Sequence, residues 1–92
     1  MRYEIKKSFD RSVKGLPEQE RTEIKKVIFE VLDVLSTGNK PSKGIRLTRL
    51  RNDYWGIGTS IKERVLFRFT NDLVQFLFVG NHDEIKRALK RL

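Results

Sequence analysis

The chain has 92 residues, no cysteine and one histidine, and 20 lysine and arginine residues against 12 acidic residues give it a net charge of +8 at pH 7. This length allows one compact domain, expected over residues 1–92, and the lack of cysteine excludes disulfides and thiolate metal sites. A single histidine also excludes a histidine-pair zinc site, so we expect no metal and no cofactor, although carboxylates alone can bind a hard cation weakly. The positive charge favours a polyanionic partner, either nucleic acid or an acidic protein.

The N-terminus has no apolar signal core, and no segment reaches the length of a transmembrane helix. We therefore expect a cytoplasmic protein without a membrane partner. Residues 2–9 alternate roughly in polarity, with Tyr3 and Ile5 on one face, which predicts a strand. Asp10 is the expected N-cap of a short helix that follows this strand and ends near Gly15.

Residues 17–36 have the clearest helical pattern in the chain. Pro17 suits the first helical position and Gly38 suits the C-terminal stop. The apolar residues fall on one stripe with a period near 3.6 residues, at Ile24, Val27, Ile28, Val31, Leu32 and Leu35. Glycine, proline and polar residues over 37–44 then predict a loop.

The second half of the chain reads as a run of strands followed by a helix. Strands are expected over residues 45–51, 54–59, 64–69 and 73–79, with turns at 52–53 and 71–72. The alternation of polarity is interrupted at Arg49 and Leu50, which indicates a bulge or the end of the strand. Glycines at 56 and 58 suggest a close approach to the backbone. Asn81 and Glu84 form a capping box for a last helix whose inward face is Ile85, Leu89 and Leu92. Strands grouped apart from helices predict an α+β fold.

Positive charge is concentrated in this second half. Residues 44–92 hold ten lysine and arginine residues against five acidic residues, whereas residues 1–43 hold ten against seven. Arginines make forked contacts to phosphates, and the candidates are Arg46, Arg49, Arg51, Arg64 and Arg68. Tyr54 and Trp55 are candidates for base stacking, with core packing as the alternative. The strand phenylalanines are assigned to the core.

His82 is the one side chain of a type that ordinarily changes charge near neutral pH. It lies at the start of the last helix, where a phosphate can dock on free backbone N–H groups. Two interpretations are open: proton transfer on a phosphate ester, or a local cap or packing contact.

The chain resembles the RelE/ParE superfamily of bacterial and archaeal toxins. The resemblance rests on YWGIGTSIKERVLFRF, a polar hairpin and LVQFLFVGNHDEIKRAL, together with Phe9, Val13, Leu16-Pro17 and one long amphipathic helix. It covers nearly the whole chain. It implies one twisted antiparallel sheet, two N-terminal helices on one face and a short C-terminal helix. It also implies the toxin of a type II toxin–antitoxin pair, neutralised in a hetero-oligomer by an acidic antitoxin.

RelE-like members of this family are ribosome-dependent endoribonucleases that cleave mRNA. Carried over by position, Arg64 matches the arginine that stabilises the scissile phosphate, and His82 matches the position of an acid, base or second cation. Arg46, Arg49 and Arg51 match auxiliary basic residues, and we add Arg68 and Lys86 as nucleic-acid contacts. Two positions depart from the family pattern: many members have tyrosine or phenylalanine at Lys86 and arginine at Gly58. Lys86 supplies a cation but cannot stack on a base.

Three alternatives stay open beside the nuclease. ParE-like members share the fold but inhibit DNA gyrase without cleaving nucleic acid, an inactive homologue would only bind the antitoxin, and a small nucleic-acid-binding module would lack toxicity. The nuclease interpretation requires Arg64 and His82 to converge on one open cleft. A histidine buried in a local hydrogen bond would deprive it of its acid–base group.

Overall fold

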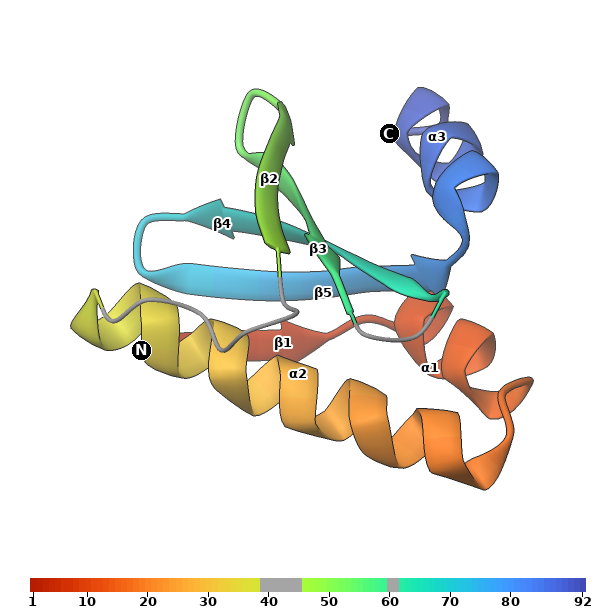
Figure 1. Ribbon diagram of the computed structural model, residues 1–92. Coiled ribbons are helices and arrows are strands. Elements are labelled where there is room, and N and C mark those ends of the chain that lie inside the picture. The colour runs from red at the N-terminus through yellow and green to blue at the C-terminus, as the bar shows by residue number, and fades with distance from the viewer. Residues whose placement is uncertain (39–45, 60–61) are drawn as a thin grey trace.

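The protein is an α+β domain built on one five-stranded sheet (Figure 1). A computed structural model describes residues 1–38, 46–59 and 62–92. The strands are β1 (Arg2–Ile5), β2 (Arg46–Arg51), β3 (Tyr54–Gly58), β4 (Arg64–Thr70) and β5 (Leu73–Gly80), and the helices are α1 (Lys7–Lys14), α2 (Glu18–Thr37) and α3 (His82–Lys90). The α+β class and the single sheet predicted from the sequence are confirmed.

The sheet has the strand order β1-β5-β4-β3-β2. The pairs β2–β3, β3–β4 and β4–β5 are antiparallel, as expected for strands joined by short turns. The pair β1–β5 is parallel, so the sheet is mixed, and the expectation of a wholly antiparallel sheet is corrected at this one pairing. No hairpin joins the first and last strands, so no turn dictates their relative direction.

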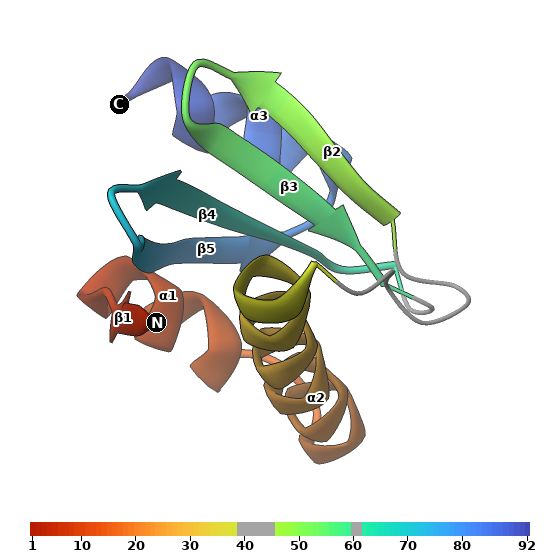
Figure 2. The same cartoon turned by 90° about the vertical axis from the view of Figure 1, so that its left-hand side faces the viewer.

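The two faces of the sheet are covered differently. Helices α1 and α2 lie on one face, whereas α3 lies on the other, as the two views of Figures 1 and 2 agree. The N-terminal helices thus share a face, as predicted. In the part of the chain that the structure describes, no helix is long and apolar enough to cross a membrane.

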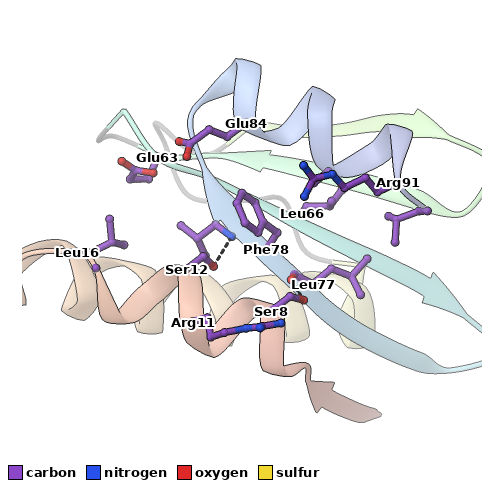
Figure 3. A pocket seen from close by; sticks show the side chains of 14 residues that line it. Ser8, Arg11, Ser12, Leu16, Glu63, Leu66, Leu77, Phe78, Glu84 and Arg91 are labelled. Carbon is purple, nitrogen blue, oxygen red and sulfur yellow. Dashed lines mark hydrogen bonds between the residues drawn. The ribbon is translucent and has the colours of Figure 1, made fainter.

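Helix α1 begins earlier than the sequence predicts. The strand expected over residues 2–9 ends at Ile5, and Asp10 lies inside α1, whose N-cap position is Lys6. The reason is long-range contact with β5: Ser8 donates a hydrogen bond to the Leu77 carbonyl, and the Ser12 hydroxyl accepts one from the Val79 N–H (Figure 3). These contacts override the local alternation of residues 2–9.

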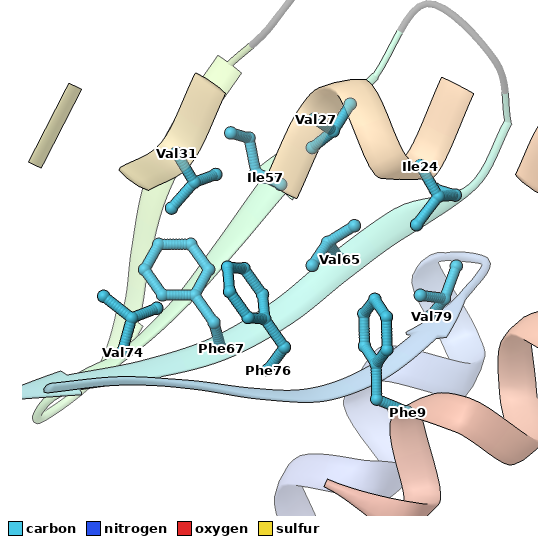
Figure 4. Packing of buried hydrophobic residues seen from close by; sticks show 10 residues of the cluster. All are labelled: Phe9, Ile24, Val27, Val31, Ile57, Val65, Phe67, Val74, Phe76 and Val79. Carbon is cyan, nitrogen blue, oxygen red and sulfur yellow. The ribbon is translucent and has the colours of Figure 1, made fainter. Parts of the chain in front are cut away.

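The core lies between α1, α2 and the sheet, and the helical stripe of α2 supplies one side of it as predicted. Ile28, Leu32 and Leu35 pack at its margin. Figure 4 shows the ten buried members: Phe9, Ile24, Val27, Val31, Ile57, Val65, Phe67, Val74, Phe76 and Val79. Trp55 and Phe69 pack against this cluster, so Trp55 serves the core. Leu66 and Ile85 are buried on the α3 side instead.

Most local signals in the sequence are confirmed. Gly38 ends α2 with a left-handed φ of 77°, and the turn at Asn71 and Asp72 has φ values of 47° and 66°, which suit a tight hairpin. A register shift lies between Arg49 and Arg51. At Gly56 an added Cβ would lie 3.1 Å from Leu50 Cδ1, which accounts for the expected close approach.

Two predictions at helix ends need correction, and one stretch cannot be compared. Pro17 occupies the N-cap position of α2 rather than its first helical position. Leu92 is 54% exposed and not part of the inward face of α3, because the helix ends at Lys90. Residues 39–44 of the predicted loop and Ile45 of the predicted strand lie outside the described residues.

Candidate functional site

Two of the predicted phosphate-binding arginines share one row across the sheet. Arg46 pairs in register with Gly58, Gly58 with Arg64, and Arg64 with Gly80. Because side chains alternate along a strand, and Leu47 and Val65 belong to the helix-covered side, Arg46 and Arg64 point to the opposite face. The two glycines paired with Arg64, Gly58 and Gly80, contribute no side chains of their own to this row.

His82 begins α3 just beyond the Gly80 end of this row. It follows Gly80, the register partner of Arg64, by two residues, so the two Cα atoms are at most about 13 Å apart. Neither residue lines a groove or pocket described in this structure, so a shared open cleft is not observed among the described residues. Both side chains are exposed. In residues 1–38, 46–59 and 62–92, neither makes a side-chain hydrogen bond or ion pair. The local hydrogen bond that would remove His82 from acid–base chemistry is therefore not present in this part of the chain.

The start of α3, which carries His82, is fixed by its sequence. The Asn81 side chain accepts a hydrogen bond from the Glu84 N–H at 2.9 Å, and the Glu84 carboxylate accepts one from the Asn81 N–H at 2.9 Å, which confirms the predicted capping box. An added Cβ at Gly80 would lie 2.7 Å from Phe78 Cε2 and 2.9 Å from Glu84 Cβ. Glycine at this position therefore sets how α3 leaves the sheet and where His82 lies.

The exposed face of α3 adds further positive charge near this row. Lys86 and the neighbouring basic residues Arg87, Lys90 and Arg91 are all exposed, as predicted. Lys86 follows His82 by one helical turn and lies on the same side of α3. Arg46, Arg64, His82 and Lys86, here called the basic set, make no side-chain hydrogen bond or ion pair with other described residues.

The other three predicted contacts, Arg49, Arg51 and Arg68, are engaged within the fold. Arg49 Nε donates to the Asn52 carbonyl at 2.7 Å and lies, by alternation with Leu47, on the helix-covered side. Arg51 Nη2 donates to the Leu89 carbonyl at 3.0 Å, which ties β2 to the end of α3. These bonds fix where the guanidinium groups lie, although each group keeps further N–H donors that can bind a phosphate.

Arg68 forms an ion pair with Asp53, with 2.9 Å between Nε and Oδ2. This hydrogen bond lowers the pKa of the Asp53 carboxyl and raises that of the Arg68 guanidinium. The guanidinium carbons of Arg51 and Arg68 each lie 5.8 Å from the Tyr54 ring centroid. Tyr54 is therefore already covered by cations rather than open for base stacking.

A groove that the sequence analysis did not predict lies between α1 and α3 and has a volume of about 730 Å³ (Figure 3). Its walls include Leu66, Phe78 and Arg91, with Glu63 and Glu84 among the acidic residues. Burial, reinforced by the negative charges of Glu20 and Glu84, raises the pKa of Glu63. Two helices distant in sequence form this groove across β5, so no local pattern could predict it. Neither Arg64 nor His82 lines it.

The described residues contain no group of three or more histidine, cysteine or acidic side chains that could hold a metal ion. The chemistry of the basic set is therefore that of an arginine, a histidine and a lysine on an exposed surface. Guanidinium and ammonium groups stabilise negative charge on a phosphate, and an imidazole transfers protons.

Comparison with known proteins identifies the fold. No family model matches the sequence, and curated proteins give no sequence match. Among solved structures, the chain is similar to the isolated RelE toxin of E. coli, with 20% identity, 98% and 96% of the two chains covered and a TM-score of 0.62. YafQ of E. coli is 17% identical, with 92% of this chain and 98% of that chain covered and a TM-score of 0.64. A RelB-RelE antitoxin-toxin complex of Methanococcus jannaschii gives 15% identity, with 91% of this chain and 95% of that chain covered and a TM-score of 0.63.

Proposed function

We propose that this chain, which has the fold of the RelE and YafQ toxins, is the toxin of a type II toxin–antitoxin pair and acts as a ribosome-dependent endoribonuclease on mRNA. The observation that supports the proposal concerns Arg64 and His82: both side chains are exposed, and neither has a hydrogen-bond or ion-pair partner among the described residues. The protein would work in the cytoplasm, where an acidic antitoxin would neutralise it in a hetero-oligomer.

The proposed reaction is attack of a ribose 2′-OH on the adjacent phosphate. The 2′-oxygen forms a bond to phosphorus, the bond to the 5′-oxygen breaks, and the products are a 2′,3′-cyclic phosphate and a free 5′-hydroxyl. Arg64 stabilises the negative charge that builds up on the phosphorane. His82 transfers one of the two protons, either from the attacking 2′-OH or to the leaving 5′-oxygen, and solvent water exchanges the other.

Arg46 and Lys86 are assigned to binding the RNA on either side of this point. Arg46 lies two strands from Arg64 on the same row, and Lys86 lies one turn along α3 from His82. We assign Arg49, Arg51 and Arg68 a weaker part: they raise the local positive potential and contact RNA through the N–H groups that their protein partners leave unused.

A second candidate function is a toxin without nuclease activity, of the gyrase-inhibiting ParE type, or an inactive homologue that only binds an antitoxin. The observation that favours it is the position of Gly58 between Arg46 and Arg64, where many members of the family carry an arginine. Lys86, in place of an aromatic residue, supports the same alternative. Both departures reduce the number of groups that can hold an RNA substrate.

The test is inducible expression in bacteria with mapping of the 5′ ends of ribosome-bound mRNA. We expect growth arrest and new 5′ ends within codons at the ribosomal A site, and both should be lost in Arg64→Ala and His82→Ala. Removal of either group should slow cleavage by about 10²–10³-fold. Lys26→Ala, an exposed lysine on the far side of α2, is the matched control and should stay active.

Arrest with DNA damage and without new mRNA ends would contradict the nuclease and support gyrase inhibition. A chain that causes no arrest, although it is folded and expressed, would support the inactive homologue.

A further inference from the structure

The groove between α1 and α3 differs in charge from the rest of the molecule. The chain carries +8, yet the charged side chains that line this groove are two carboxylates, Glu63 and Glu84, and two guanidinium groups, Arg11 and Arg91. The apolar part of the lining comes from Leu16, Leu66, Leu77, Phe78, Val79, Ala88 and Leu92. Because its charges balance, the groove does not favour the polyanions that the basic surfaces attract.

The two carboxylates lie at one end of the groove. Glu63 directly precedes β4, whose first residue pairs with Gly80, and Glu84 lies in the first turn of the helix that follows Gly80. Figure 3 shows their side chains together. The Glu63 side chain makes no hydrogen bond or ion pair with another described residue. Burial, together with the charges of Glu20 and Glu84, raises the pKa of Glu63, so this end of the groove lacks a compensating cation among the described residues.

The positive charge of Arg91 lies farther along the groove. Arg91 follows Glu84 by seven residues, which is about 10 Å along α3 at a rise of 1.5 Å per residue. In Figure 3, Arg91 lies on the other side of Phe78 from the two carboxylates, and Arg11 lines the opposite wall, on α1. Neither guanidinium has a hydrogen-bond or ion-pair partner among the described residues. Opposite charges are thus separated by an apolar surface.

The main chain of β5 inside the groove already has partners. Strand β1 pairs with β5 only as far as Phe76. Beyond that residue, Ser8 donates a hydrogen bond to the Leu77 carbonyl, and the Val79 N–H donates to the Ser12 hydroxyl (Figure 3). An extended chain therefore finds no free row of N–H and C=O groups to which it could add as a strand. A ligand in this groove must be recognised through its ends and its side chains.

We propose that the groove between α1 and α3 binds a short apolar peptide of about three residues whose two ends are free. The terminal ammonium pairs with Glu63 and Glu84, and the terminal carboxylate pairs with Arg91. The apolar side chains of the peptide pack on Phe78 and its neighbours. Three extended residues span about 10 Å, which matches the separation of the charges along α3.

The charges of the groove also select against other occupants. A segment inside a longer protein carries neither terminal charge, and a fatty acid or an alkylamine carries only one of the two. Each of them would leave one end of the groove without its counter-ion, whereas a free peptide satisfies both ends. The inference goes beyond the proposed function and does not depend on it.

The test uses the purified full chain, labelled for amide NMR, and the tripeptide leucyl-alanyl-leucine at millimolar concentrations. Its N-acetylated and C-amidated forms are the matched controls, because each lacks one terminal charge and keeps the side chains. We expect the free peptide to cause saturable shifts at the amides of Ser12, Glu84 and Ala88, and each modified form to bind at least tenfold more weakly. Since the ligand touches both helices, it should also slow amide hydrogen exchange in α3.

Two variants assign the ends of the peptide. Glu63→Gln should weaken the free peptide at least tenfold and remove its advantage over the acetylated form. Arg91→Gln should do the same for the amidated form. Arg87→Gln, on the exposed surface of α3 and outside the groove, is the control and should bind the free peptide as the wild type does. Unchanged far-UV circular dichroism verifies that each variant is folded.

Three results would overturn the proposal: no binding of the free peptide, equal binding of the free and modified peptides, or shifts confined to residues outside the groove. Equal binding would assign the groove to any apolar segment, such as one of a partner protein. The outcome is separable from the proposed function. A chain that cleaves mRNA but binds no peptide contradicts the groove ligand alone, and one that binds the peptide but cleaves no mRNA contradicts the nuclease alone.

Discussion

The two faces of the sheet differ in burial and in charge, although the same strands form both. On the side of α1 and α2, residues such as Phe67 and Phe76 are fully buried and hold the fold together. On the other side only α3 gives cover, and Arg46 and Arg64 remain exposed without protein partners among the described residues. Alternation along β4 places Val65 and Phe67 in the core while Arg64 faces outward. A small domain can thus keep a rigid core directly behind an open, charged surface.

The largest expected effect comes from the buried face. Phe67→Ala should lower the free energy of unfolding by about 3–5 kcal/mol, because it leaves a large cavity against Phe76 and the helices. The matched variant is Phe78→Ala on the α3 side, where the ring is only half-buried and the loss should be clearly smaller. Urea denaturation of both variants at 25 °C measures the difference. Equal losses in the free energy of unfolding would contradict the conclusion that the face covered by α1 and α2 holds the fold together.

The next effect concerns the junction between the sheet and α3. Gly80→Ala should destabilise the protein by about 1–3 kcal/mol, because the added methyl group meets Phe78 and Glu84 at less than 3.0 Å. It should also disturb the capping box and displace His82, so the amide NMR shifts of Asn81 and Glu84 should change. Gly58→Ala is the control on the same row: its nearest neighbours are 3.9 Å away, and we expect a change within about 1 kcal/mol. A similar loss in both variants would argue against a steric role of Gly80.

The difference between the faces also separates what the sequence could reveal from what it could not. The helical stripe of α2, the Asn71-Asp72 turn and the Asn81-Glu84 capping box depend on residues near one another in the chain, and all were predictable. The parallel pairing of β1 with β5 and the start of α1 depend on contacts between the two ends of the chain, which no local pattern encodes.

Contacts between residues distant in the chain also explain why the sequence could not show which candidate site residues have protein partners. Sequence position could single out arginines, but not which of them are occupied within the fold. Arg51 donates to the Leu89 carbonyl 38 residues away, and Arg68 pairs with Asp53 across 15 residues, whereas Arg64 has no hydrogen-bond or ion-pair partner among the described residues. Contacts over such distances in the sequence cannot be read from a local pattern.

A smaller effect is expected from the tie between β2 and α3. Arg51→Ala removes the hydrogen bonds from Nη2 to the Leu89 and Leu92 carbonyls at 3.0 and 3.5 Å. The last turn of α3 should then open more often, so its amide hydrogens should exchange faster while the denaturation midpoint changes little. Arg46→Ala, on the same strand but without a partner among the described residues, should leave this exchange unchanged. Equal amide hydrogen exchange in the wild type and both variants would show that the Arg51 hydrogen bonds do not stabilise the last turn of α3.

The smallest effect is a pH dependence of opposite sign at two carboxylates. The hydrogen bond from Arg68 lowers the pKa of Asp53 from its ordinary 3.8, so this pair stabilises the fold above that pH and the contribution is lost as the pH falls through the folded-state pKa. Glu63 is the counterpart: burial and the charges of Glu20 and Glu84 raise its pKa from 4.5, so stability is lost as the pH rises through the raised value. At pH 7, Asp53→Asn should therefore be less stable than the wild type and Glu63→Gln more stable. Both differences should shrink as urea denaturation is repeated towards pH 3, and differences that do not depend on pH would mean that neither carboxylate acts through its charge.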